Sequence, residues 1–139
     1  QAGELDIATN VPFNQLQALQ QNPDVKVVLD AVARIDYIGL NLRRPPLDDK
    51  KLRQAMNYAV DKQAIIDNVL FGFGEPATTF LPKMPGWDPN SPGYPYDLEK
   101  AKQLVAESAG KDGFEAKLLV QAGEAIDIQF GQLVATALE

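Results

Sequence analysis

An acidic pair is the first feature of this sequence that could do chemistry. Asp48 and Asp49 are adjacent, and paired carboxylates can act in hydrolysis or bind hard cations such as calcium. The pair stands directly before an amphipathic segment, where the first amide groups of a helix need side-chain acceptors. Capping a helix is therefore the favoured interpretation of these two residues, and hydrolysis is the alternative.

Residue types on which most hydrolases depend are absent from the chain. Its 139 residues include no histidine and no cysteine, which excludes Ser-His-Asp triads, cysteine nucleophiles, imidazole or thiolate metal sites, and disulfides. A hydrolase would have to rely on Asp48, Asp49 or Asp88 alone. We therefore expect a protein that is not an enzyme, with no catalytic residue, no metal ion and no cofactor.

Two further patterns resemble ligand loops only in part. Residues 72–74 read Gly-Phe-Gly, but the third glycine, the Lys-Ser/Thr pair and the preceding strand of a phosphate loop are missing. A later loop offers four oxygen-bearing side chains that a calcium ion could use: Asp88, Asn90, Ser91 and Asp97. Their spacing is not that of the helix–loop–helix calcium hand, and turns are rich in the same residue types.

The charge balance disfavours nucleic acid as a partner. Thirteen Lys and Arg residues against nineteen Asp and Glu residues give a formal net charge of −6, and nucleic acids select clustered basic residues. The adjacent Arg43 and Arg44 are interpreted as solvated surface, with an anionic contact as the alternative. No apolar run in the sequence approaches the ~20 residues of a membrane span.

A proline-rich loop carries a cluster of aromatic residues. Residues 75–96 include six prolines: Pro76, Pro82, Pro85, Pro89, Pro92 and Pro95. Because proline cannot join a hydrogen-bonded ladder, this segment is predicted to be a long, stiff loop. It holds Trp87, the single tryptophan, which either packs on the body of the domain or lines a cleft. If the chain contacts a ligand, we expect the contacts to come from Trp87, Phe80 and Tyr94.

Apolar residues at helical spacing predict three long helices, each following an aspartate. The first would begin after Asp48 and bury residues at relative positions 0, 3, 4, 7 and 8, namely Leu52, Ala55, Met56, Ala59 and Val60. Asp61 and Asp97 would cap the other two. Both are therefore expected to be structural residues without contact to a ligand.

Glycines and shorter apolar patterns predict the remaining helix boundaries. Gly72 would end the second long helix in a left-handed conformation, and Gly110 would end the third. A short helix is predicted from a cap at Asn14 through Gln20, and a last helix from near Glu124.

Runs of β-branched and apolar residues between the helices predict strands. These runs lie at residues 5–8, 25–29, 37–42 and 114–121. Because strands and helices interleave, the predicted fold class is α/β, with a mixed sheet of at least three strands flanked by helices.

The two ends of the chain suggest an excerpt from a longer protein. The sequence begins at Gln1 without a methionine and stops at Glu139 within an amphipathic helix. A helix with one apolar face needs a partner that covers that face. We therefore expect the isolated chain to expose apolar surface and to self-associate.

Residue strings along nearly the whole chain match the signature of one transport family. They are 3–8 (GELDIA), 37–41 (YIGLN), 46–49 (PLDD), 52–62 (LRQAMNYAVDK), 72–82 (GFGEPATTFLP) and 96–110 (YDLEKAKQLVAESAG). Together they resemble extracytoplasmic solute-binding proteins of the dipeptide/oligopeptide/nickel type, which serve ABC importers. The string at 52–62 is the most specific. Two departures are mild: Lys62 stands where arginine is usual, and Leu98 stands where proline is common.

The resemblance implies a periplasmic-binding-protein-like lobe and a role in transport. Family members have two lobes joined by a hinge, and residues 1–139 would be a single partial domain, a portion of the second, C-terminal-side lobe. The full-length protein would bind a peptide or a related small molecule and deliver it to ABC permease subunits. It would lie in the periplasm or on the extracellular face of the cell membrane. Relatives carry peptides, nickel chelates, sugars, opines or antibiotics, so the ligand stays open.

Two other classes stay open from the residues alone. One is a small aspartate-dependent hydrolase, and the other is a stand-alone protein-interaction domain that uses the aromatic loop. A hydrolase turns over its substrate, whereas a binding protein only titrates with its ligand, so these classes are separable by a simple assay.

Overall fold

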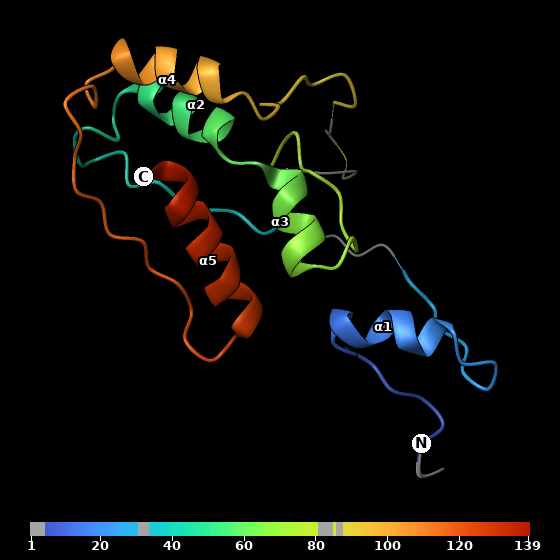
Figure 1. The fold of residues 1–139 in the computed structure, drawn as a ribbon. Helices are drawn as coiled ribbons and strands as arrows, with labels where there is room; N and C mark the ends of the chain where they lie inside the picture. Colours follow the sequence, from blue (N-terminus) through green and yellow to red (C-terminus); the bar gives the residue numbers. More distant parts are fainter. Residues whose placement is uncertain (1–4, 31–33, 81–84, 86–87) are drawn as a thin grey trace.

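The computed structural model describes residues 5–30, 34–80, 85 and 88–139. These residues form five helices (Figure 1). In chain order they are α1 (Phe13–Gln20), α2 (Lys50–Ala59), α3 (Lys62–Val69), α4 (Leu98–Ala106) and α5 (Ala125–Leu138). No helix in this part of the chain combines the length and the apolar composition that a membrane crossing requires.

Helices α2 and α4 lie side by side and form the most closely packed pair (Figure 1). Their contact buries Leu52, Ala55 and Ala101, which are 2%, 1% and 3% exposed. The alanines let the two backbones approach, because they carry no bulky side chain. Gly110, after α4, is also close-packed, since a Cβ atom there would lie 2.9 Å from Cδ1 of Leu52.

A second apolar cluster joins α3 to α5. Ile65, Val69 and Val134 are buried in it. Five partly buried residues surround them: Ile38, Val60, Leu70, Ile126 and Phe130. Helix α1 lies apart from the other four helices (Figure 1). Its Phe13 ring stacks on Phe73, which follows α3, with 5.9 Å between the ring centroids.

Aspartates cap three of the helices. Asp61 accepts a hydrogen bond from the Ala64 amide at the start of α3 (3.0 Å), which confirms that it is the predicted cap. Asp97 accepts one from the Lys100 amide at the start of α4 (2.8 Å), also as predicted. The cap of α2 is Asp49 and not Asp48, so that assignment is wrong by one residue.

Several other helix limits differ from the sequence prediction. Helix α1 begins at Phe13, and its N-cap is Pro12 without a side-chain hydrogen bond, so Asn14 lies inside the first turn and is not the cap. Helix α4 ends at Ala106, well before Gly110, because the chain there turns back toward α2. Gly72 does have the predicted positive φ (+82°), and its amide donates to the carbonyl of Ile66, at the end of α3.

The segments predicted as strands are not strands in the described part of the chain. Residues 5–8, 25–29, 37–42 and 114–121 belong to neither a helix nor a strand. Many of their apolar side chains are exposed, among them Leu119 (91%), Ile7 (82%) and Val28 (63%). A strand is stable only when a neighbouring strand satisfies its N–H and C=O groups. The predicted mixed sheet is therefore not observed, because none of the described residues provides such a neighbour.

Candidate functional site

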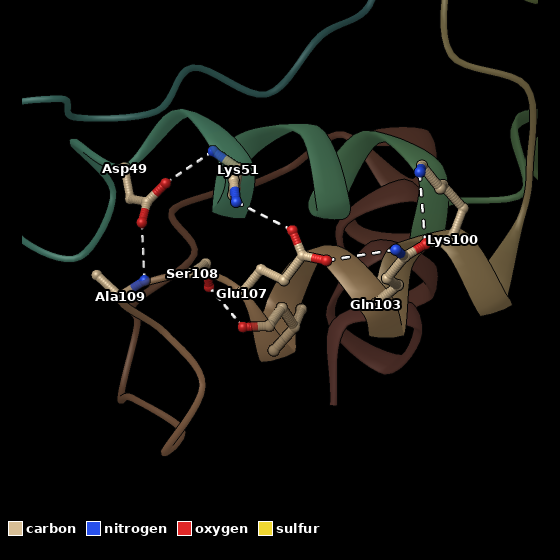
Figure 2. Close-up of polar contacts among 8 residues, drawn as sticks. Asp49, Lys51, Lys100, Gln103, Glu107, Ser108 and Ala109 are labelled. Carbon is tan, nitrogen blue, oxygen red and sulfur yellow. Dashed lines mark hydrogen bonds and ion pairs between the residues drawn. The ribbon is translucent and has the colours of Figure 1, made fainter.

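Asp49 of the acidic pair, which was the first candidate for chemistry, is a structural clamp. The Asp49 carboxylate accepts hydrogen bonds from the Lys51 amide (2.7 Å) and from the Ala109 amide (2.7 Å), so it joins the start of α2 to the turn after α4 (Figure 2). The hydrogen bond from Ala109 is the main cause that lowers the pKa of Asp49 below its ordinary value. An ionised carboxylate engaged by amides suits a cap and does not suit a general acid.

An ion pair extends this clamp along the same two helices. Lys51 Nζ lies 2.9 Å from a carboxylate oxygen of Glu107, which also accepts from Gln103 (Figure 2). The hydrogen bond from Lys51 is the main cause of the lowered pKa of Glu107. Both side chains of the pair are about half exposed, and exposed pairs contribute little to stability. The ion pair therefore adds a weak link between α2 and the end of α4 and does not form a reactive site.

Two of the carboxylates considered for calcium, those of Asp88 and Asp97, accept backbone amides nearby in the chain. The Asp88 carboxylate accepts from the Asn90 amide (2.9 Å), and the Asp88 carbonyl accepts from the Ser91 amide (3.2 Å). Asp97 caps α4. Within the described ranges, no group of three or more acidic side chains is placed to hold a metal ion. Residues 72–74 follow the end of α3 and do not lead into a helix, unlike a phosphate loop.

Tyr94, one of the predicted ligand residues, lies against the α2–α3 junction. Its ring meets Tyr58 of α2 edge-on, with 5.2 Å between centroids and an interplanar angle of 84°. Its carbonyl accepts a hydrogen bond from Nζ of Lys62 (2.7 Å). The residue is still 36% exposed, so part of it remains available for contact.

Phe80, the second predicted ligand residue, is exposed beside another aromatic ring. It meets Tyr37 edge-on, with 5.1 Å between the ring centroids. Phe80 is 61% exposed and Tyr37 is 62% exposed. Trp87, the third predicted residue, lies outside the described residues. The structure therefore places Phe80 and Tyr94 at separate aromatic contacts.

Sequence reasoning missed two residues that accompany the aromatic loop. Tyr37 is the first residue of the segment predicted as a strand at 37–42. Its aromatic side chain is the one signal that could have marked it as a possible contact of the loop. Lys62 stands where relatives usually have arginine, but this difference does not indicate its contact. The hydrogen bond from Lys62 to the Tyr94 carbonyl joins residues 32 positions apart. Burial lowers the pKa of the Lys62 ammonium. No local sequence pattern indicates a contact over that distance.

Two adjoining hollows lie between α3 and α5. The larger has a volume of about 230 Å³ and is lined by Asn68, Val69, Gln129, Gln132 and Leu133. The smaller, of about 110 Å³, shares Asn68 and Leu133 with it. None of the described residues of the aromatic loop lines either hollow. The hollows are thus separate from Phe80 and Tyr94.

Comparison with known proteins identifies the family. The middle-region model of the bacterial extracellular solute-binding proteins, family 5, matches residues 1–139. The chain belongs to this family, which confirms the resemblance seen in its residue strings. Membership implies a periplasmic-binding-protein-like fold, whose helices are the part observed in the described residues.

Individual relatives bind solutes and match most of the chain. Heme-binding protein A of Haemophilus influenzae is 40% identical over 123 residues, which cover 87% of this chain and 22% of that protein. Glutathione-binding protein GsiB of Escherichia coli (strain K12) is 30% identical over 118 residues, covering 85% and 23%. GsiB of Pectobacterium atrosepticum is 34% identical over the same length. The chain thus spans less than a quarter of the length of these curated relatives.

Proposed function

We propose that this chain is a portion of the substrate-binding component of an ABC importer and has no catalytic activity. The observation that carries the proposal is the family match over residues 1–139. The relatives are named for the small molecules that they bind and not for reactions. We infer a peptide or a related small solute as the ligand class, because glutathione is itself a tripeptide.

The exposed apolar segments support a place within a larger lobe. We propose that residues 1–139 form part of the second, C-terminal-side lobe of a two-lobed protein. In that lobe, segments 25–29, 37–42 and 114–121 would pair with further strands into a mixed sheet. Exposed side chains such as Leu119 and Val28 favour this assignment, because burial of a large aliphatic side chain contributes about 1.5–3 kcal/mol.

The aromatic loop is the proposed ligand contact. Phe80 presents an exposed ring, and Tyr94 retains an exposed part of its ring. Aromatic faces can stack on planar groups or cover apolar ones. Trp87 belongs to the same proposal on the strength of the sequence alone. Proline residues restrict the free loop, so ordering it on a ligand costs little entropy.

The proposed partners and location follow from the same role. The full-length protein would hand its ligand to ABC permease subunits at the periplasmic or extracellular face of the membrane. We also propose that the isolated chain self-associates through its exposed apolar segments, since nothing else in solution covers them.

Native mass spectrometry of the full-length protein tests the proposed function. The protein is incubated separately with glutathione, heme and trialanine, and the complex and the released small molecule are both weighed. We expect one unaltered small molecule per protein for at least one of the three. Cleaved glutathione or trialanine would favour the hydrolase alternative, and the absence of every complex would contradict the binding role.

A further inference from the structure

The loop at residues 75–96 is narrow at its base. Gly93 has a φ of +58°, and a Cβ atom built on it would lie 3.0 Å from both Cα and Cβ of Thr78. The two arms of the loop therefore pass in van der Waals contact at these residues. Phe80 lies two residues beyond this crossing.

The returning arm is fixed to the helices directly after the crossing. Nζ of Lys62 donates to the Tyr94 carbonyl (2.7 Å), and the Tyr94 ring packs on Tyr58. The Asp97 amide donates to the Tyr58 carbonyl (3.0 Å). Lys62 also reaches the carbonyl of Asn57 (3.4 Å). One ammonium group therefore joins α2, the start of α3 and the aromatic loop.

The hydrogen bonds of Lys62 differ from those of other lysines in the described part of the chain. Lys51 faces the half-exposed carboxylate of Glu107, directly after α4, and Lys102 faces the exposed carboxylate of Glu99 on its own helix. Such pairs contribute little to stability. Lys62 instead directs a partly buried charge at neutral backbone carbonyls. A charged donor makes a stronger hydrogen bond than a neutral one, especially away from water.

We propose that Lys62 is a positioning residue: it fixes the arm that carries Tyr94 and so presents Tyr94 and Phe80 to the ligand. This role rests on the proposed function, because it requires the loop to contact the ligand. A preorganised loop loses less conformational entropy on binding. Loss of the Lys62 ammonium therefore lowers ligand affinity without removing any atom that touches the ligand.

The first measurement follows the loop arm without any ligand. Lys62→Met removes the ammonium and keeps an apolar stem, and Lys102→Met is the matched control on α4. Amide hydrogen exchange at Asp97 reports whether the arm stays on Tyr58. We expect exchange about tenfold faster in Lys62→Met than in wild type and the control. Wild-type exchange in Lys62→Met would overturn the role of Lys62.

The second measurement is ligand affinity in the full-length protein, with glutathione and heme as probes. We expect Lys62→Met to weaken binding of the preferred probe by about tenfold, and Lys102→Met to leave it unchanged. Lys62→Arg should retain wild-type affinity, because a guanidinium can donate to the same carbonyls. Gly93→Ala, which strains the crossing at Thr78 independently of Lys62, should weaken binding in the same direction.

The outcomes separate this role from the proposed function. Binding by wild type with unchanged affinity in Lys62→Met overturns the positioning role and leaves the proposed function standing. If wild type binds neither probe, the proposed function fails for these ligands and the role of Lys62 in presenting the loop fails with it. Weaker binding in both Lys62→Met and Gly93→Ala, with Lys62→Arg intact, supports the role.

Discussion

At the scale of single residues, carboxylates organise this chain by accepting backbone amides. Asp49, Asp61 and Asp97 each satisfy an amide that a helix leaves free at its first turn. Asp49 accepts a second amide from Ala109, which is 60 positions away. Asp49, one of the carboxylates that could have suggested a hydrolase, is thereby committed to a structural role.

Replacement of Asp61 tests the cap of α3. Asp61→Ala removes the acceptor of the Ala64 amide and should lower the free energy of unfolding by about 1 kcal/mol. Asp67→Ala is the control, because Asp67 is exposed on the same helix and accepts only from the Gln63 side chain among the contacts observed. Urea unfolding of both variants measures the difference. Equal stability of the two variants would contradict the cap.

Because the pKa of Asp49 is lowered in the folded state, the free energy of unfolding depends on pH in the acid range. Its ordinary pKa is 3.8, and amide donors lower the folded value. The ionised cap therefore stabilises the fold above about pH 4, and this contribution is lost as the pH falls through the folded pKa. Urea midpoints measured stepwise into acid should fall less steeply for Asp49→Asn than for wild type. An unchanged slope in Asp49→Asn would refute the assignment.

At the scale of elements, the helices could be predicted and the sheet could not. Helix signals are local. The spacing of Leu52 and Ala55 predicts α2, and the aspartates Asp61 and Asp97 predict where α3 and α4 begin. Strand pairing depends on segments far along the chain, so β-branched runs such as 25–29 predict only a capacity to pair. The contact between Lys62 and Tyr94 is equally non-local, which is why sequence reasoning missed it.

The packing of α2 on α4 depends on the absence of a side chain at Gly110. A Cβ atom there would lie 2.9 Å and 3.1 Å from the two terminal carbons of Leu52, which is 2% exposed and would have to shift within the packed interface. We expect Gly110→Ala to lower stability by about 1–3 kcal/mol. Gly39→Ala is the control, because the nearest atom to a Cβ there is 4.0 Å away. Thermal unfolding compares the two, and an unaffected Gly110→Ala would show that the interface is loose.

At the scale of the whole molecule, the described residues bury few apolar side chains and expose many. The buried apolar residues belong mainly to the helices, whereas Leu119, Ile7 and Val28 lie exposed in the segments predicted as strands. This distribution supports the proposal that further parts of a larger lobe cover these segments. It agrees with a chain that spans less than a quarter of its relatives.

The exposed segment around Leu119 should drive self-association of the isolated chain. Sedimentation velocity over a range of concentrations is expected to show association that Leu119→Lys weakens, because a charge on an unpaired edge opposes pairing. Leu98→Lys is a matched control, since Leu98 is exposed on α4, outside these segments. A strictly monomeric wild type at high concentration would contradict the expectation.

The central claim is that this chain belongs to a protein that binds a small solute and does not transform it. Calorimetric titration of the full-length protein with glutathione, and separately with heme, tests it most directly. We predict that, for glutathione or for heme, the heat of binding saturates at one ligand per protein molecule and that further additions release no more heat. Heat that continues in proportion to added glutathione, as turnover produces, or the absence of saturable heat with both, would contradict it.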